Sequence, residues 1–328
     1  MSLTLRFLGT AASRPTVERN VSSLAVVREG ETMLVDCGEG TQRQMMRYGI
    51  SFALGDVFFT HLHTDHLLGI VGLTRTLQLG GRTEPLRLWG PRGTGRALRH
   101  AVQFNGERVG FPVEVLEVEA GTPIRRGDDY AVVPFAVEHP GSAAVGYAFV
   151  EHERRGRFHP ELARALGIPE GPLWGRLHRG QPVTLDDGRV VDPATLVGPT
   201  RPGRTVVVTG DTRPCAATVE AARGADLLVH EATFADDEAE RARETGHSTA
   251  REAAQVARVA EVRRLVLTHI SARYSHDTRE LEAQARGVFP VVSVARDGTE
   301  IDVPFRDAAE AAAAGTAALP APFPAPQG

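Results

Sequence analysis

The amino-acid sequence predicts an α/β fold. Short apolar runs recur along the chain with amphipathic stretches between them, which is the alternation typical of this class. Hydrophobic residues make up 42% of the 328 residues, enough to fill the core of one large domain or of two ordinary ones. Several of the apolar runs also end in histidine or aspartate, and α/β sheets bind their ligands at the carboxyl ends of their strands.

The expected strands are the short apolar runs. They are residues 3–8, 23–27, 32–37, 57–60, 86–89, 113–118, 131–137, 145–150, 205–209, 227–230, 265–268 and 291–294. Helical periodicity is clearest at residues 41–48, 67–78, 94–104, 214–222, 248–259 and 278–286. The helix at 248–259 begins with Ser248, which we expect to be its N-terminal cap.

Two segments interrupt this alternation. Residues 153–203 are rich in Gly, Pro and Arg and contain only short apolar pieces, so we expect an insertion between core strands that forms an extended arm. Residues 306–328 are a low-complexity Ala/Pro tail, which we expect to be disordered. The predicted organisation is therefore one domain over residues 1–305, with the arm inserted at 153–203, followed by the tail.

The charge distribution limits the kinds of partner. A net charge of −4 argues against a protein coated with positive charge, so a polyanionic partner must meet a local basic patch. Every one of the 37 basic residues is arginine, a side chain that pairs bidentately with phosphate. Residues 154–179 hold six arginines and two glutamates, and this part of the arm is the basic patch that such a partner requires.

The sequence also predicts a compartment. Cys37 and Cys215 cannot build a disulfide framework and lie in no C-x-x-C pair, so we expect reduced thiols that fill the core. The N-terminus shows no leader pattern, and no run approaches the ~20 apolar residues that span a bilayer. We therefore expect a cytoplasmic protein without a membrane partner.

The densest cluster of chemically active side chains lies in residues 58–69, FFTHLHTDHLLG. His61, His63, Asp65 and His66 directly follow an apolar run, although such side chains are poor occupants of a core. The residues alone leave three interpretations open: a metal site, a nucleophilic site or a solvated loop. An H-x-H pair can direct two imidazoles toward one point while Asp65 and His66 face a second, so two neighbouring metal sites are favoured.

Further ligands for two such sites must come from distant positions. His139 follows the run AVVPFAVEH, Asp211 lies in VVVTGD, and His269 ends LVLTH. Alone, they are more typical of a core histidine, a turn residue and a strand-end histidine. Since each lies at the end of an expected strand and the cluster needs partners, we interpret all three as metal ligands.

The order of H-x-H-x-D-H, a separate histidine, the aspartate of G-D-T and a late T-H resembles the metallo-β-lactamase fold family. The resemblance implies an αββα sandwich with the site at one edge of the packed sheets. It also implies two Zn²⁺ ions per subunit, for which Mn²⁺ or Co²⁺ can substitute. It assigns one ion to His61, His63 and His139, the other to Asp65, His66 and His269, and the bridging position to Asp211.

Within that superfamily, residues 3–302 are similar to the ribonuclease Z family in its bacterial long-arm form. Four further stretches carry the similarity: LVDCGEGTQRQ at 34–44, LGIPEGPLWGRLHRG at 166–180, HEATF at 230–234 and GHSTAREAA at 246–254. The resemblance implies a homodimeric endoribonuclease that cleaves the 3′ trailer from precursor tRNA. It would leave a 3′-hydroxyl on the tRNA and a 5′-phosphate on the trailer.

The resemblance also suggests catalytic roles. Two metal ions lower the pKa of an attacking water, and Asp65 would orient or deprotonate that water. His247 in the His-Ser-Thr loop would protonate the leaving 3′-oxygen, with Glu231 orienting the ring of His247. The alternatives are structural, because His-Ser-Thr is also a helix-cap sequence and Glu231 can simply brace the end of a strand.

Contacts with tRNA are expected in two places. The arm would hold the folded RNA through its phosphates and its shape. The expected arm contacts are Arg154, Arg155, Arg157, Arg176 and Arg179. Near the cut, the family's P-x-K-x-R-N loop reads PTVERN at 15–20, with Val17 in place of lysine and Arg19 as the expected contact.

Two other functions remain open on the sequence. One is a general dinuclear-metal phosphodiesterase or small-substrate hydrolase of the same fold, which would not need the arginine-rich arm. The other is an RNA-binding factor in which the metal site is structural.

Overall fold

The computed structural model of the protein describes residues 2–106, 108–126 and 129–306. They divide into two units, one of residues 2–150 and 204–304 and one of Glu151–Gly203 with Phe305 and Arg306. Apart from Arg306, the expected tail at 306–328 lies outside the described residues. Within the described ranges, no helix combines the length and apolar character needed to cross a membrane.

The larger unit is built on two seven-stranded sheets. The first contains β1 (Leu3–Gly9), β2 (Ser23–Arg28), β3 (Glu31–Val35), β4 (Leu54–Phe58), β5 (Leu86–Pro91), β6 (Val113–Val118) and β16 (Glu300–Asp302), in the order β16-β1-β2-β3-β4-β5-β6. The second contains β7 (Ile124–Arg126), β8 (Tyr130–Ala136), β9 (Val145–Glu151), β12 (Thr205–Val208), β13 (Leu227–Glu231), β14 (Leu265–Thr268) and β15 (Val292–Val294), in the order β15-β14-β13-β12-β9-β8-β7.

Each sheet contains a run of parallel strands. β3, β4, β5 and β6 pair in parallel in the first sheet, and β12, β13, β14 and β15 do so in the second. Within each run the carboxyl ends of the strands lie along one edge of the sheet.

The central strands are buried on both faces, and their side chains alternate between two cores. In β8, Tyr130 and Val132 belong to the apolar cluster between the sheets, whereas Ala131 and Val133 belong to the cluster that includes α9. This period of two is what a strand imposes on its side chains. An apolar run without polar alternation is therefore the expected sequence of such a strand.

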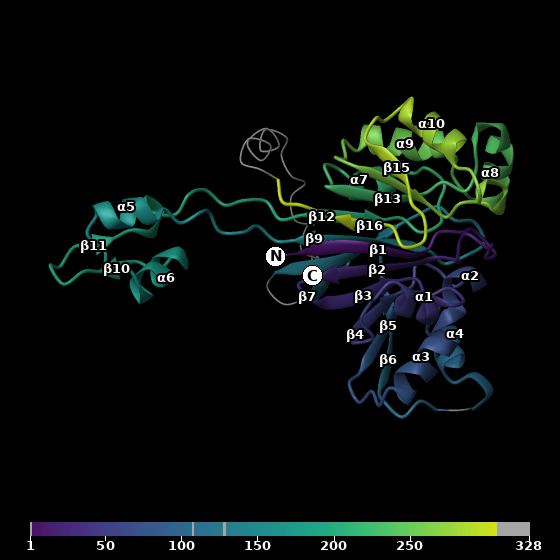
Figure 1. Cartoon of the computed structure of the whole chain (residues 1–328), viewed down its shortest axis with the longest axis horizontal. Coiled ribbons are helices and arrows are strands. Elements are labelled where there is room, and N and C mark those ends of the chain that lie inside the picture. Colours follow the sequence, from purple (N-terminus) through teal and green to yellow (C-terminus); the bar gives the residue numbers. More distant parts are fainter. Residues whose placement is uncertain (1, 107, 127–128, 307–328) are drawn as a thin grey trace, which may run out of the picture. The chain divides into compact units, whose positions relative to one another are not determined.

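Helices cover the outer face of each sheet (Figure 1). The helices of this unit are α1 (Thr41–Arg47), α2 (Thr64–Leu67), α3 (Gly69–Leu79), α4 (Gly95–Val102), α7 (Ala216–Ala221), α8 (Ala239–Thr245), α9 (Ala250–Val259) and α10 (Arg279–Arg286). α1, α3 and α4 pack with the first sheet, and α7, α9 and α10 with the second. The expected αββα sandwich is confirmed.

The expected elements differ from the structure in several details. Three-residue β7 and β16 were not expected. The helix expected at 67–78 is present as α3, and the short α2 that precedes it was not expected. The prediction of Ser248 as a helix cap is wrong. Thr249 caps α9, because its Oγ1 accepts the N–H of Glu252 while Glu252 accepts the N–H of Thr249. Ser248 Oγ instead donates to the carbonyl of Thr212, 2.6 Å away.

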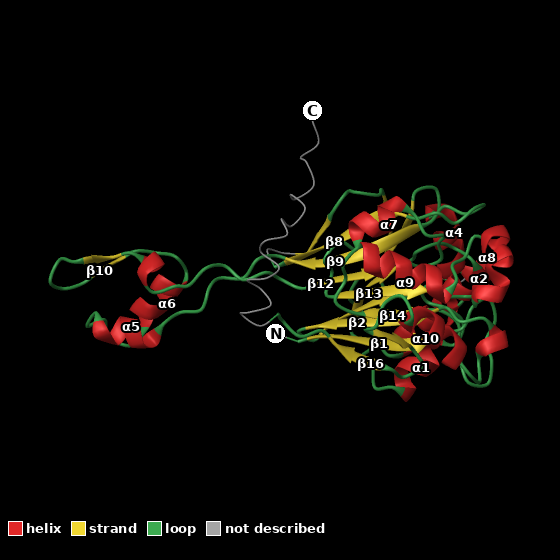
Figure 2. Cartoon of the chain, turned by 90° about the horizontal axis from the view of Figure 1, so that it is seen from above, coloured by secondary structure: helices red, strands yellow, loops and turns green. Residues whose placement is uncertain are grey.

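The second unit has a core of its own. It contains α5 (Pro160–Ala165), α6 (Pro172–His178) and a two-stranded sheet of β10 (Val183–Thr184) and β11 (Val190–Val191) (Figure 2). The buried core residues are Ala163, Ile168, Leu177, Val183, Val191 and Leu196. The residues expected to form the inserted arm therefore include a small folded unit with secondary structure of its own.

Candidate metal centre

The seven expected ligands come together in the larger unit, and each lies shortly after the end of a strand. His61, His63, Asp65 and His66 follow β4. The other three are His139 after β8, Asp211 after β12 and His269 after β14. The short helix α2 starts after His63 and places Asp65 and His66 in its single turn.

One group consists of His61, His63, His139 and Asp211, whose ligand atoms all lie within 4.8 Å of one another. His63 Nδ1 is 3.0 Å from His61 Nε2 and 3.3 Å from His139 Nε2. Asp211 Oδ2 is 3.5 Å from His61 Nε2. Three nitrogens and a carboxylate at this spacing are a ligand set that zinc accepts.

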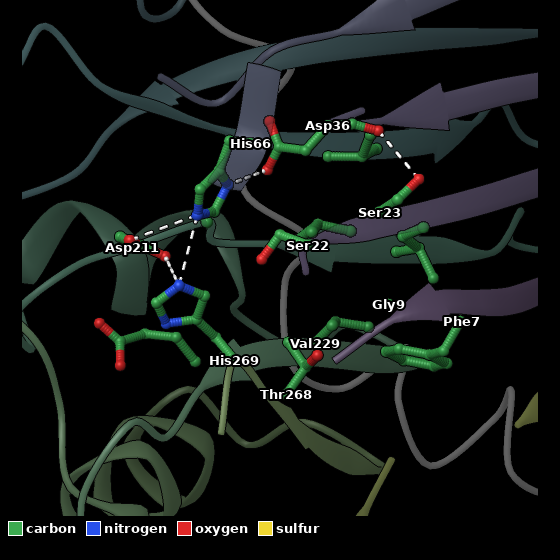
Figure 3. A pocket seen from close by; sticks show the side chains of 15 residues that line it. Phe7, Gly9, Ser22, Ser23, Asp36, His66, Asp211, Val229, Thr268 and His269 are labelled. Carbon is green, nitrogen blue, oxygen red and sulfur yellow. Dashed lines mark hydrogen bonds and ion pairs between the residues drawn. The ribbon is translucent and has the colours of Figure 1, made fainter. Parts of the chain in front are cut away.

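A second group consists of Asp65, His66 and His269, within the same limit. His269 Nε2 is 3.3 Å from His66 Nε2 and 3.4 Å from Asp65 Oδ2. Asp211 reaches this group too, with Oδ2 3.4 Å from His66 Nε2 and Oδ1 3.3 Å from His269 Nε2 (Figure 3). Asp211 is therefore the one carboxylate in contact with histidines of both groups among the described residues.

The outward-facing nitrogens of four of these five histidines are held by the protein. The contacts of Nδ1 are Thr60 Oγ1 for His61 (3.1 Å), Asp36 Oδ2 for His66 (2.7 Å), Gly246 O for His139 (3.0 Å) and Thr233 Oγ1 for His269 (2.9 Å). When Nδ1 donates in this way, Nε2 keeps its lone pair for a cation. The donor set therefore fits metal ions.

The electrostatics of the centre favour the same interpretation. Burial lowers the pKa of His61 to about 2, so this ring is neutral, as a metal ligand must be. Burial alone would raise the pKa of Asp211, but the imidazoles of His269 and His66 hold it well below its ordinary value. Asp211 Oδ1 is buried and accepts no hydrogen bond from a described residue, although His269 Nε2 lies near it.

Two buried carboxylates hold the histidines, and the sequence interpretation gave a role to only one of them. Asp36, directly after β3, accepts hydrogen bonds from Thr60 Oγ1 at 2.8 Å and from the Thr60 N–H at 2.8 Å, in addition to its contact with His66. Asp36 was part of a stretch that carried the family resemblance, but no role was assigned to it. The available signal was a carboxylate within the apolar run expected as a strand at 32–37, where such a side chain is unusual.

Glu231, at the end of β13, is the second carboxylate. It accepts from Thr233 Oγ1 at 2.7 Å and from the Thr212 N–H at 3.0 Å, and its Oε1 is 2.9 Å from His247 Nδ1. The expected pairing of Glu231 with His247 is therefore present in the structure.

His247 lies at the edge of the centre. Its side chain is 12% exposed, and its ring centroid is 5.2 Å from that of His139 and 5.3 Å from that of His269. Burial alone would lower the pKa of His247, but the carboxylates of Glu231 and Asp211 raise it to about 9. Gly246, which precedes it, has a φ of 75° and ends α8.

The arm arginines differ in exposure. Arg155, Arg157, Arg176 and Arg179 are exposed. Arg154 is partly buried, with its guanidinium carbon 3.2 Å from the centroid of the Phe305 ring. Arg154 is therefore occupied by a contact within its own unit.

The expected contact between Arg19 and tRNA is contradicted by the position of its side chain. Arg19 is 2% exposed, and its Nη1 donates to Thr10 Oγ1 and to the carbonyl of Ala295, both at 2.7 Å. A buried guanidinium with these partners ties together distant parts of the chain and presents no surface to a phosphate.

We predict that Asp36→Ala lowers the affinity for Zn²⁺ about ten- to a hundredfold, because His66 and Thr60 lose the carboxylate that orients them. Competition with a chromogenic chelator measures the affinity, and circular dichroism checks that the variant is folded. The matched control is Asp186→Ala, which removes an exposed aspartate of the second unit. An affinity equal to that of this control would show that Asp36 does not support the centre.

Comparisons with known proteins place the chain in a family. A family described as a β-lactamase superfamily domain matches residues 31–200 and 177–270. Ribonuclease Z of Gemmatimonas aurantiaca is 68% identical over 303 residues, which are 92% of this chain and 96% of the relative. Ribonuclease Z of Myxococcus xanthus is 54% identical over 306 residues, covering 93% of this chain and 99% of the relative.

A solved structure agrees with these relatives. The short form of human tRNase Z is similar with a TM-score of 0.66 and 25% identity, covering 92% of this chain and all of that chain. The two bacterial relatives align with nearly the full length of this chain, and the aligned residues include the metal centre and the inserted unit. The chain therefore belongs to the ribonuclease Z family of the β-lactamase superfamily.

Proposed function

We propose that this chain is a zinc-dependent endoribonuclease that removes the 3′ trailer from precursor tRNA, leaving a 3′-hydroxyl on the tRNA and a 5′-phosphate on the trailer. The observation that carries the proposal is the pair of ligand groups joined by Asp211, in a chain closely related to proteins named ribonuclease Z. The metal would be two Zn²⁺ ions per subunit, for which Mn²⁺ or Co²⁺ could substitute.

The two groups would each hold one ion. The first would use His61, His63 and His139, the second Asp65, His66 and His269, and Asp211 would bridge the two. When bound, the ions supply Lewis acidity that lowers the pKa of a water and neutralises charge on the phosphate oxygens.

The chain's own residues would move the protons. Asp65, whose Oδ2 accepts the N–H of Ser13 at 2.8 Å, would orient the attacking water and take its proton. As the bond between phosphorus and the 3′-oxygen breaks, His247 would give its proton to that oxygen. Glu231 is a positioning residue in this scheme, because it holds the ring of His247 and keeps it protonated at neutral pH.

The inserted unit would bind the tRNA body. Four of its exposed arginines, Arg155, Arg157, Arg176 and Arg179, are available for phosphates in a chain whose net charge is −4. We further propose that the enzyme is a homodimer and acts in the cytoplasm, on the ground of the family resemblance and of two cysteines that form no disulfide.

We predict that the wild-type protein cuts a 3′-extended precursor tRNA near the discriminator base and leaves an unstructured RNA of the same 3′ sequence intact. A chelator should abolish the cutting, because the residues alone supply no Lewis acid. Gel analysis of end-labelled RNA measures both. Equal cutting of the two RNAs would instead indicate a general phosphodiesterase.

We predict that His247→Ala slows tRNA cleavage about 10²- to 10⁴-fold, the range for loss of a general acid, with unchanged metal content. Because the pKa of His247 is raised to about 9, the acid form is present at neutral pH and is lost as the pH rises through that value. The alkaline fall in activity should therefore be absent from the variant. The control is His100→Ala on the exposed surface, and loss of metal from the His247 variant would assign that residue a ligand role instead.

We predict that replacing Arg155, Arg157, Arg176 and Arg179 by alanine raises the KM for precursor tRNA. The dependence of tRNA binding on salt should also weaken, because fewer phosphate contacts release fewer counterions. Hydrolysis of a small chromogenic diester should be unchanged, since this substrate makes no contact with the inserted unit. Equal losses of activity on both substrates would show that these arginines are needed for folding rather than for tRNA binding.

A further inference from the structure

A cleft of about 600 Å³ opens beside the metal centre, within the larger unit. Its walls come from three segments that are distant in the sequence: residues 12–14, residues 233–247 and residues 271–273. Thr233 and His247 line the cleft and also contact the carboxylate of Glu231. The cleft is therefore continuous with the place where the proposed chemistry occurs.

Three exposed arginines line this cleft: Arg14, Arg241 and Arg273. Arg273 Nε lies 3.2 Å from Glu238 Oε1, so part of its charge is compensated. Arg14 and Arg241 form no ion pair with any residue in the described ranges. The guanidinium carbon of Arg241 lies 6.0 Å from the centroid of the largely buried ring of Phe234. In a chain of net charge −4, two unpaired guanidiniums in one cleft attract an anion.

The backbone ties Arg14 to the metal centre. The N–H of Ser13 donates to Asp65 Oδ2 at 2.8 Å, and the N–H of Arg14 donates to the carbonyl of Ala12 at 2.7 Å. Between these bonds Ser13 has a φ of 62°, so the three residues form a tight turn of a kind that is strained for a residue with a side chain. The hydrogen bond to the expected ligand Asp65 thus fixes the turn from which Arg14 enters the cleft.

We propose that this cleft binds the phosphodiester backbone of the RNA strand next to the cleaved bond, through Arg14 and Arg241. The inference rests on the proposed function and adds to it a second anion site, separate from the arm, that acts on the single-stranded end of the substrate. A guanidinium pairs bidentately with a phosphate, and a basic groove that tracks the backbone is how single strands are held without sequence preference.

The test compares the double variant Arg14→Ala/Arg241→Ala with the matched double variant Arg96→Ala/Arg258→Ala. The control removes two exposed arginines that line no part of the cleft and form no ion pair with a described residue. For each protein, kcat/KM is measured on precursor tRNA over a range of salt concentrations and on bis(p-nitrophenyl) phosphate.

We expect the cleft variant to lose about tenfold or more in kcat/KM on precursor tRNA, and its salt slope to fall by about 1.4, or about 0.7 for each single-strand phosphate contact. Hydrolysis of the small diester should change less than twofold. Arg14→Lys/Arg241→Lys should restore the salt slope, because lysine keeps the charge. A cleft variant that matches the control double variant on tRNA, or that loses both activities equally, overturns the proposal.

Two further experiments distinguish failure of this proposal from failure of the proposed function and identify the bound strand. If the wild-type protein makes no chelator-sensitive cut in precursor tRNA, both the proposed function and the cleft proposal fail. If the wild-type protein cuts precursor tRNA and the cleft variant cuts it as well as the control double variant does, the cleft proposal fails while the proposed function stands. Precursors with trailers of one and of several nucleotides then locate the contact: a defect that needs the longer trailer places the trailer in the cleft, and a defect with both places the tRNA end there.

Discussion

The centre depends on a buried carboxylate whose charge the surrounding protein compensates only in part. Asp211 is 3% exposed, yet its neighbours hold it ionised. Burying an ionised carboxylate is unfavourable unless opposite charge lies nearby. Asp211 and Asp36 raise the pKa of His66 against the effect of burial, and a bound cation would take the place of the proton on Nε2 of that ring. His61 supplies no such charge while it is neutral. Cations between the two histidine groups would complete the compensation of the charge on Asp211. The segments after β4, β8, β12 and β14 bring the side chains that could hold such cations to this place.

The two sheets support the centre in matching ways. On the first sheet, Asp36 holds Thr60, whose hydroxyl in turn contacts Nδ1 of His61. On the second, Glu231 holds Thr233, whose hydroxyl contacts Nδ1 of His269. In each case a carboxylate orients a threonine and the threonine orients a histidine. Each carboxylate also holds a second histidine directly, at 2.7 Å for His66 and 2.9 Å for His247. Imidazole rings that are held through Nδ1 lose little conformational entropy when they bind a metal ion, which is the advantage of a preorganised site.

Most of the fold, and the set of side chains that come together at the centre, could be predicted from the sequence because both depend on local patterns. Strands buried on both faces appear as continuous apolar runs, and the expected ligands follow those runs closely. What could not be predicted depends on contacts between distant residues. Arg19 is buried because Thr10 and the carbonyl of Ala295 accept its donors, and that pairing has no sequence signature. Ser248 has the chemistry of a cap but bonds to Thr212, so the next residue caps the helix. Three-residue strands such as β16 are too short to show a period.

Gly246 limits how this region can change during evolution. Its carbonyl orients His139, an expected ligand, while its left-handed backbone ends α8 and leads into His247, the proposed acid. A Cβ atom at this position would lie 2.5 Å from Pro140 Cδ, and a side chain there would also be strained by the φ of 75°. Gly246 thus helps to position both an expected ligand, His139, and the proposed acid, His247. Insertions and deletions between α8 and α9 would disturb the two together, so length variation in homologues should collect before α8 rather than in this turn.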